Sequence, residues 1–153
     1  MTTYTFFGHR EVYQSDIEAR LEAEIEKLLK TDNEFVFLTG GMGQFDSMGA
    51  KAVRAAKRRH LNKLITLALV LPYMSNRLNT DKEYYQLYYD QIIIPEEAVI
   101  AHYKAAIQIR NRWMVDQSDA AIAYVCRDFG GAFSTVGYAE KQGKPVINLA
   151  EKN

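Results

Sequence analysis

Short apolar runs alternate with helical patterns along nearly the whole chain, and this alternation restricts the fold more than any other feature. The runs that we interpret as strands are Tyr4–Phe7, Phe35–Leu38, Leu64–Leu71, Ile92–Ile94, Ala120–Val125 and Val146–Leu149. Segments with helical spacing lie between them, most clearly at 15–29, 46–59, 97–117 and 134–142. Strands that alternate with helices at this spacing form a mainly parallel sheet with helices on both faces. We therefore predict a Rossmann-like three-layer α/β/α fold with about six strands.

Local signals refine the expected helices. Ser15 and Glu18 have the spacing of a capping box at the start of the first helix, and Gly143 suits the cap that ends the last one. The side chains that we expect to face the core are Ile17, Leu21, Ile25, Leu28 and Leu29 in the first helix, Met48, Ala52, Val53 and Ala56 in the second, and Ile100, Tyr103, Ile107 and Met114 in the third. Between 73 and 90 four tyrosines have helical spacing, which indicates packing or a subunit contact.

The composition fits one globular domain over residues 1–153. The chain has no repeat, low-complexity segment or linker-like stretch, and its length suffices to bury a sizeable core. Lysine plus arginine equals aspartate plus glutamate, 19 each, so no net field draws the protein toward nucleic acid or a membrane. The N-terminus lacks a signal-peptide pattern, and no apolar run approaches the roughly 20 residues that span a bilayer. We expect a cytoplasmic protein without membrane contact.

Cys126 is the single cysteine, so an intramolecular disulfide is excluded. This agrees with a reducing compartment. Because Cys126 ends a hydrophobic run and no histidine motif accompanies it, we interpret it as a buried structural thiol.

Three glycine-containing loops follow the predicted strands. They are Gly8-His9-Arg10, Gly40–Asp46 and Arg127–Ser134. Because ligands of open parallel sheets bind beyond the carboxyl ends of the strands, near the point where the strand order reverses, we expect these loops to form one binding pocket.

The loop Gly40-Gly41-Met42-Gly43 allows two interpretations. Glycines let the backbone approach a ligand closely and direct N–H groups at an anion, but a short glycine run is also simple turn geometry. The position for a third glycine of a dinucleotide fingerprint holds Asp46, and no GxxxxGK[ST] motif is present. Gly41, Gly43 and Asp46 are therefore candidates for one wall of the pocket, where Asp46 could meet a ribose hydroxyl.

The loop Gly130-Gly131-Ala132-Phe133-Ser134-Thr135 predicts a phosphate site more directly. Backbone donors, hydroxyl donors and the positive end of a helix dipole coincide there. The alternative interpretation makes Ser134 an N-cap and nothing more.

Charged residues beside these loops extend the candidate site. Arg10 follows Gly8 and could hold a phosphate or carboxylate. Arg110 and Asn111 lie near the end of the third helix, in a segment that a basic helix face with a buried Trp113 would also explain. No cluster has metal-ligand spacing and no serine has a triad setting, so the sequence indicates neither a metal nor a cofactor.

The segment from Arg110 to Asp119, the apolar strand after it and Gly130–Thr135 together resemble the SLOG superfamily, which joins DprA/SMF proteins with the "lonely guy" phosphoribohydrolases. Gly8-His9-Arg10 and the stretch from Gly137 to Pro145 add to the likeness. Within the superfamily the chain most resembles the small YpsA-like branch of unknown function, DUF1273.

This resemblance implies a Rossmann-like fold, homodimers or higher homo-oligomers, and a pocket for nucleotides or their derivatives. In the phosphoribohydrolase branch an arginine and a glutamate carry catalysis. Arg110 takes the arginine position by that match, while Asn111 replaces a lysine and Tyr138 stands at the glutamate position, with Glu140 nearby.

Three functions follow as alternatives. The first is binding or sensing of a phosphorylated nucleoside or related ligand by Gly8, Arg10, Gly41, Gly43, Asp46, Arg110, Asn111, Gly130, Gly131, Ser134 and Thr135. The second is an N-glycosidic hydrolase with Arg110 and either Glu140 or Asp46 as catalytic residues. The third is single-stranded DNA binding, which the balanced charge disfavours because such binding usually needs a basic groove.

Overall fold

The computed structural model describes residues 1–150, with Asn79 described by its backbone alone. Its strands are β1 (Thr2–Gly8), β2 (Glu34–Thr39), β3 (Leu64–Val70), β4 (Gln91–Ile93), β5 (Ala120–Tyr124) and β6 (Val146–Asn148). Its helices are α1 (Ile17–Leu28), α2 (Gln44–Arg59), α3 (Asn76–Thr80), α4 (Lys82–Tyr88), α5 (Glu96–Val99), α6 (Tyr103–Asp116) and α7 (Gly131–Lys141). All six expected strands occur, whereas the predicted domain end at Asn153 lies outside the described residues.

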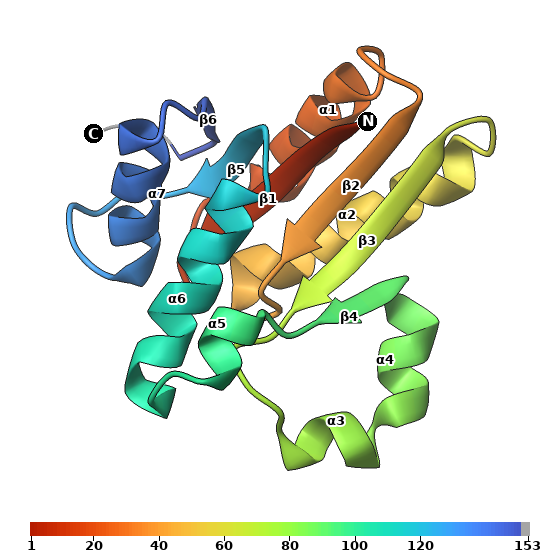
Figure 1. The fold of residues 1–153 in the computed structure, drawn as a ribbon. Coiled ribbons are helices and arrows are strands. Elements are labelled where there is room, and N and C mark those ends of the chain that lie inside the picture. Colours follow the sequence, from red (N-terminus) through yellow and green to blue (C-terminus); the bar gives the residue numbers. More distant parts are fainter. Residues whose placement is uncertain (151–153) are drawn as a thin grey trace.

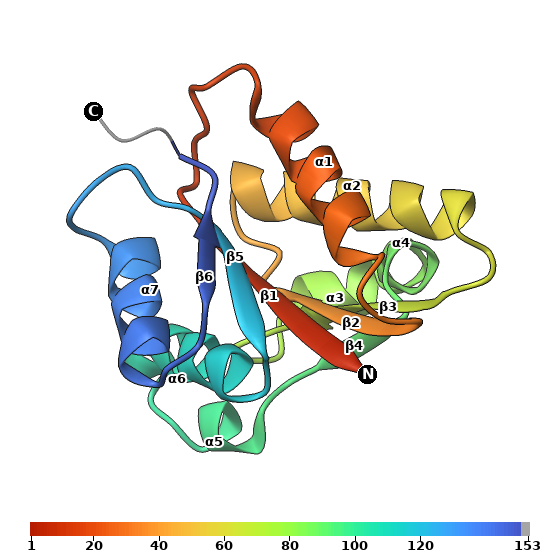
Figure 2. The ribbon, with the colours of Figure 1, turned by 90° about the horizontal axis from the view of Figure 1, so that it is seen from above.

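The six strands form one parallel sheet in the order β4-β3-β2-β1-β5-β6. Figures 1 and 2 show α1 and α2 on one face of this sheet and α6 and α7 on the other, with α3 and α4 beside β4. The predicted three-layer Rossmann-like fold is therefore confirmed. Among residues 1–150, no helix is long and apolar enough to cross a membrane.

Strand β1 lies in the middle of the sheet, and both of its faces are buried. Tyr4 and Phe6 point toward α1 and α2 and stack on Phe37, with ring centroids 5.6 and 5.9 Å apart. Phe7 points to the opposite face and belongs to the core cluster that includes Met114 of α6. Burial on both faces is typical of a central parallel strand.

The predicted capping box at Ser15 is wrong. Helix α1 begins at Ile17, so the N-cap is Asp16, whose side chain makes no capping hydrogen bond within the described residues. Its φ of −94° and ψ of 3° are not the extended conformation of a capping residue. The Asp16 carboxylate instead pairs with Nε of Arg20 one turn later, at 2.7 Å. The expected apolar face is confirmed for Ile17, Leu21, Ile25 and Leu29, and Leu28 is half-buried.

The predicted apolar stripe of the third helix is also wrong in its first half. The segment folds as two helices, and Ile100 and Tyr103 are 83% and 63% exposed. The break lies at the residue before Tyr103, His102, whose Nδ1 accepts the N–H of Lys104 as an N-cap. The buried face of α6 consists of Ala106, Arg110, Met114 and Val115.

The last helix ends as predicted. Gly143 has a φ of +74°, and the N–H of Lys144 donates to the carbonyl oxygen of Ala139 at 3.0 Å, which is a Schellman arrangement. In the second helix, Ala52, Val53 and Ala56 are buried and Met48 is partly buried against the same cluster.

The tyrosines of the 73–90 region pack on the body of the protein and on each other. The guanidinium of Arg54 on α2 lies 4.7 Å from the Tyr88 ring centroid, and Tyr89 packs against the larger core cluster. Tyr84 is 55% exposed. The packing interpretation is thereby supported for Tyr88 and Tyr89, and the subunit contact stays a prediction.

Candidate functional site

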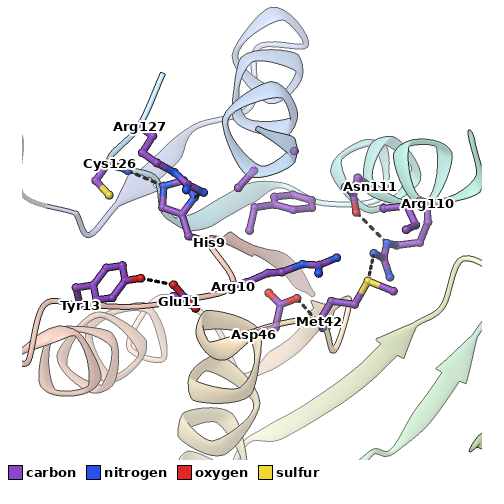
Figure 3. Close-up of a pocket in the computed structure, with 15 residues that line it drawn as sticks. His9, Arg10, Glu11, Tyr13, Met42, Asp46, Arg110, Asn111, Cys126 and Arg127 are labelled. Atoms are coloured by element: carbon purple, nitrogen blue, oxygen red, sulfur yellow. Dashed lines mark hydrogen bonds between the residues drawn. The ribbon is translucent and has the colours of Figure 1, made fainter. Parts of the chain in front are cut away.

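A pocket of about 590 Å³ opens at the carboxyl edge of the sheet. The described residues that line it are Phe7, Gly8, His9, Arg10, Glu11, Tyr13, Met42, Asp46, Ile107, Arg110, Asn111, Cys126, Arg127, Gly131 and Ala132. All three glycine-containing loops contribute, together with α6. Figure 3 shows His9 and Arg127 together in one part of the pocket, and Arg110, Asn111 and Met42 in another.

The strand order explains why a pocket forms at this place. β1 and β5 are neighbours, with Gly8 opposite Tyr124 at their carboxyl ends. The chain leaves β1 toward β2 and leaves β5 toward β6, on opposite sides of the pair. The loops after the two strands therefore diverge, and a crevice opens between them, as is general for such switch points.

Arg110 is a structural part of the pocket wall. It is only 3% exposed, and its Nη1 donates to the carbonyl oxygens of Val70 and Gly40, at 2.8 and 3.2 Å. Nε donates to Oδ1 of Asn111 at 2.8 Å, and Nη2 lies 3.5 Å from Sδ of Met42. Burial lowers the pKa of Arg110, although an arginine remains charged in proteins. Its charge thus reaches the pocket, while its donors hold the ends of β2 and β3 together.

Asp46 lies in the first turn of α2 and is buried at the pocket wall, with 8% of its surface exposed. Burial raises the pKa of Asp46 to about 7, although the Met42 N–H, which donates to Oδ2 at 3.1 Å, and the charge of Arg110 both act to lower it. The carboxyl group therefore titrates near neutral pH, which is common for groups that bind ligands or transfer protons.

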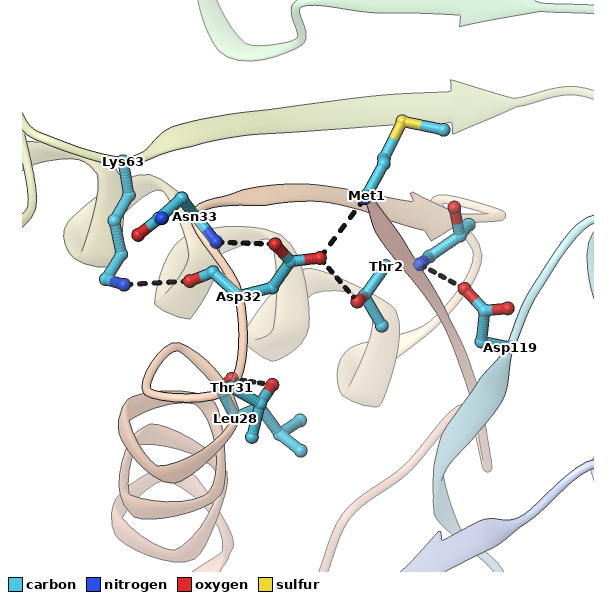
Figure 4. Close-up of polar contacts among 9 residues, drawn as sticks. Met1, Thr2, Leu28, Thr31, Asp32, Asn33, Lys63 and Asp119 are labelled. Atoms are coloured by element: carbon cyan, nitrogen blue, oxygen red, sulfur yellow. Dashed lines mark hydrogen bonds and ion pairs between the residues drawn. The ribbon is translucent and has the colours of Figure 1, made fainter.

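Asp32, by contrast, has a pKa lowered to about 2, and its contacts are structural. It accepts hydrogen bonds from the Asn33 N–H at 2.7 Å and the Thr2 hydroxyl at 2.9 Å, and it pairs with the amino group of Met1 at 3.2 Å. Figure 4 shows this group beside Asp119, which accepts the N–H of Thr3. These contacts fasten the amino end of β1, at the opposite edge of the sheet from the pocket.

The first turn of α7 faces the pocket. Gly130 has a φ of +96° and precedes Gly131 and Ala132, both of which line the cavity. The first N–H groups of a helix have no partner inside the helix and carry the positive end of its dipole. Ser134 is exposed, and the hydroxyl of the buried Thr135 donates to the carbonyl oxygen of Gly131 at 2.8 Å. Gly130, Ser134 and Thr135 do not belong to the described lining residues.

The glycines of the β2–α2 loop have structural reasons of their own. Gly41 has a φ of +66°, and a Cβ there would lie 2.6 Å from Leu69. Gly43 has a φ of +92°, and a Cβ there would lie 2.7 Å from the Cα of Arg10. Neither belongs to the described lining residues, so turn geometry and packing explain both.

Gly8 lines the pocket, and its lack of a side chain also serves packing. A Cβ at this position would lie 2.4 Å from the ring of Phe45, a fully buried residue. Replacing Gly8 by alanine is expected to destabilise the protein by about 1–3 kcal/mol through overpacking. The midpoint of urea unfolding measures this effect.

Gly137→Ala is the matched control for Gly8→Ala. Gly137 is in the interior of α7. Apart from its chain neighbours and the nearby backbone of α7, no described atom lies within 4 Å of a Cβ placed there. This change is expected to leave stability unchanged or to raise it by up to about 1 kcal/mol. Equal midpoints for Gly8→Ala and the unmodified protein would contradict the packing account.

Several lining residues were not predicted from the sequence. Glu11, Tyr13 and Ile107 carry no recognisable motif, and Met42, Ala132 and Arg127 were included only as members of the loops. The expectation that Cys126 is buried is wrong: it is exposed and lines the pocket. Asn148 explains this exposure. Its side-chain amide accepts the N–H of Val125 and donates to the Val125 carbonyl oxygen, in place of a neighbouring strand. The chain therefore leaves the sheet before Cys126.

The catalytic candidates at the end of the chain lie away from the pocket. Tyr138 packs between α6 and α7, where its hydroxyl donates to Asp116 at 2.8 Å and the guanidinium of Arg112 lies 5.2 Å from its ring centroid. Glu140 is exposed on α7 and lies outside the described lining residues. Of the acidic candidates, only Asp46 reaches the pocket.

Comparison with known proteins supports the fold. No protein-family model matches the chain, and no curated protein matches it. Among solved structures it is similar to DNA processing protein A from Helicobacter pylori, a protein that binds single-stranded DNA, with a TM-score of 0.65 and 19% sequence identity. The match covers 95% of this chain but 63% of the other, so this chain spans less than two thirds of that protein. At this identity, the likeness shows the fold alone.

Proposed function

We propose that the pocket binds a phosphorylated nucleoside or another nucleotide-derived ligand, and that the protein acts as a binding or sensing module. The observation that carries this proposal is the convergence of Arg10, Arg110 and Arg127 with the first turn of α7 in one pocket at the switch point of the sheet. Glu11 and Asp46 are the acidic residues among the described lining residues, and Asp46 is partly protonated near pH 7. The balance of charge therefore favours an anion.

The geometry suggests how a nucleotide would lie. Its phosphate would face Gly131, Arg127 and the exposed Arg10, where helix dipole and guanidinium groups act together. The buried Asp46 would meet a hydroxyl or amine of the sugar or base, as either donor or acceptor according to its protonation state. A pocket of about 590 Å³ is within the usual range for small-molecule sites.

Membership of the SLOG superfamily, and of its YpsA-like branch, is part of the same proposal. The DprA-like fold supports it at the level of architecture. The positions of Tyr138 and Glu140 favour binding over N-glycosidic hydrolysis, because a catalytic carboxylate must lie next to the reacting centre. Asp46 is the residue on which a hydrolase alternative would depend.

A thermal-shift screen against nucleoside mono-, di- and triphosphates, ADP-ribose, NAD and cyclic dinucleotides tests the proposal. A ligand that binds only the folded state raises the unfolding temperature, and one present at about 100 times its Kd stabilises by about 2.7 kcal/mol. We expect at least one nucleotide to give such a shift and to be recovered unchanged by chromatography. Release of ribose phosphate would identify a hydrolase, and the absence of any shift would refute the nucleotide pocket.

Single-stranded DNA binding is the second candidate, supported by a specific surface. Tyr13, Phe129 and Phe133 are 82%, 60% and 43% exposed; the first two lie in loops and Phe133 lies in the first turn of α7. Tyr13 and Arg127 line the pocket, and the Arg127 guanidinium lies 4.8 Å from the Phe129 ring centroid. Exposed aromatics beside arginines are the usual means of stacking unpaired bases. Binding of a labelled oligonucleotide that weakens steeply with salt would support this function.

A further inference from the structure

His9 has a hydrogen-bond donor close to each of its ring nitrogens. The N–H of Cys126 donates to Nε2 at 3.0 Å, and Nη2 of Arg127 lies 3.1 Å from Nδ1. His9 itself is buried, with 6% of its surface exposed, and its ring packs edge-on against Tyr124. Figure 3 shows His9, Cys126 and Arg127 together at the pocket wall.

The two contacts cannot both be hydrogen bonds. A neutral imidazole has one N–H and one acceptor nitrogen, and an imidazolium has two N–H groups. The backbone N–H of Cys126 is always a donor, so Nε2 must be the acceptor and the proton of the neutral ring must be on Nδ1. The Nδ1–H of His9 and the N–H groups of Arg127 then face each other as donors.

Two hydrogen-bond donors that face each other can both donate to one acceptor placed between them. Arg127 is exposed on the loop after β5, where its guanidinium lies over the exposed Phe129 ring, so a side-chain rotation would bring it toward the cavity. His9, by contrast, is fixed by the Cys126 amide. The burial of His9 and the positive charge of Arg127 both lower its pKa, and the ring therefore stays neutral at neutral pH. A phosphate oxygen, with several lone pairs and a negative charge, suits both groups.

We propose that a phosphate oxygen of the ligand bridges Nδ1–H of His9 and the guanidinium of Arg127, so that this pair is the phosphate-recognition element of the pocket. The proposal rests on the nucleotide-binding function above and assigns roles within it. Arg110 shapes the wall through its bonds to Val70 and Gly40, whereas Arg127 contacts the ligand.

Nuclear magnetic resonance of the full chain tests the first step. In the absence of added anions, long-range proton–nitrogen spectra of His9 are expected to show Nδ1 protonated and Nε2 as the acceptor. Protonation on Nε2 would overturn the proposal.

Titration with inorganic phosphate and with AMP tests the bridge itself. Each is expected to shift the His9 Nδ1–H and Arg127 side-chain signals, whereas acetate at equal concentration is not. Equal shifts with acetate would overturn the proposal, because the pair would then recognise any carboxylate.

Three variants complete the test. Arg127→Gln is expected to weaken AMP binding about tenfold to hundredfold, the usual effect of losing a charge-assisted bond. In His9→Gln the amide oxygen can accept the Cys126 N–H, but the ring that fixes the Nδ1 donor beside Arg127 is lost, and a loss of about tenfold is expected. Arg112→Gln, on α6 beside Tyr138, is the matched control and should bind AMP as the unmodified protein does.

The outcomes separate this inference from the proposed function. AMP binding that leaves His9 and Arg127 unperturbed would overturn the bridge and leave the nucleotide pocket intact. Shifts with inorganic phosphate but no response to any nucleotide would support the bridge and refute the nucleotide function. No response to inorganic phosphate or to any nucleotide of the screen would overturn both.

Discussion

Replacing Gly131 by leucine is expected to abolish nucleotide binding while leaving the fold intact. Gly131 is the first residue of α7 and lines the pocket. Apart from its chain neighbours and the nearby backbone of α7, no described atom lies within 4 Å of a Cβ placed there. The new side chain would therefore meet little protein but would occupy the space in front of the helix N-terminus. The stabilisation by a nucleotide at about 100 times its Kd would fall from about 2.7 to about 0.4 kcal/mol if affinity dropped about a hundredfold.

The measurement is the thermal shift with the best nucleotide of the screen, and Gly137→Leu is the control. Gly137 is in the same helix, and a Cβ there is equally free of close contacts with the described residues, but it does not line the pocket. Both variants should have the circular dichroism of the unmodified protein. If Gly131→Leu bound the nucleotide as tightly as Gly137→Leu does, the N-terminus of α7 would be removed from the site.

Replacing Asp46 by asparagine is expected to stabilise the protein, and more so at pH 8 than at pH 4. The folded-state pKa of about 7 lies above the unfolded value near 3.8, so folding favours the protonated acid. Stability is therefore greatest below the unfolded pKa and falls as pH rises between about 4 and about 7, as linkage requires. A shift of about three pKa units corresponds to at most about 4 kcal/mol.

Urea unfolding at pH 4, 6 and 8 measures this effect. Asparagine removes the buried charge and keeps an oxygen that can accept the Met42 N–H, so the gain of Asp46→Asn should grow from pH 4 to pH 8. Asp128→Asn, at an exposed position of the loop after β5, is the control and should show no such growth. If Asp46→Asn raised the free energy of unfolding equally at every pH, or lowered it at pH 8, the carboxylate would be well solvated in the folded state.

The fold was largely predictable because its signals are local and periodic. Each strand is a short apolar run, and Ile17, Leu21, Ile25 and Leu29 repeat at helical spacing. The errors occurred at helix ends, where local side-chain contacts accompany a different first residue of the helix. Ser15 and Glu18 match a capping-box motif, yet the helix begins one residue later than that motif requires. The apolar stripe predicted from Ile100 onward assumed one continuous helix, whereas the helix breaks before Tyr103.

The place of the site was predictable, but most of its chemistry was not. Glycine loops at strand ends indicated the pocket, and Gly8, Arg10, Asp46, Arg110, Asn111 and Gly131 of the predicted residues line it. The roles of the individual site residues depend on contacts between segments that are distant in the sequence. Nothing in the sequence shows that Arg110 bonds Val70, that His9 meets the Cys126 amide, or that Gly41 and Gly43 are required by packing.

The strand order also determines when the pocket can form during protein synthesis. One wall of the pocket comes from residues 7–46 and the other from residues 107–132, and they meet because β1 pairs with β5. Translation must therefore pass residue 120 before Tyr4 can pair with Ala120, and pairing between strands so far apart in the chain is intrinsically slow. Until β1 and β5 pair, the two walls of the pocket are separate, so a ligand that needs both walls would bind only after this pairing.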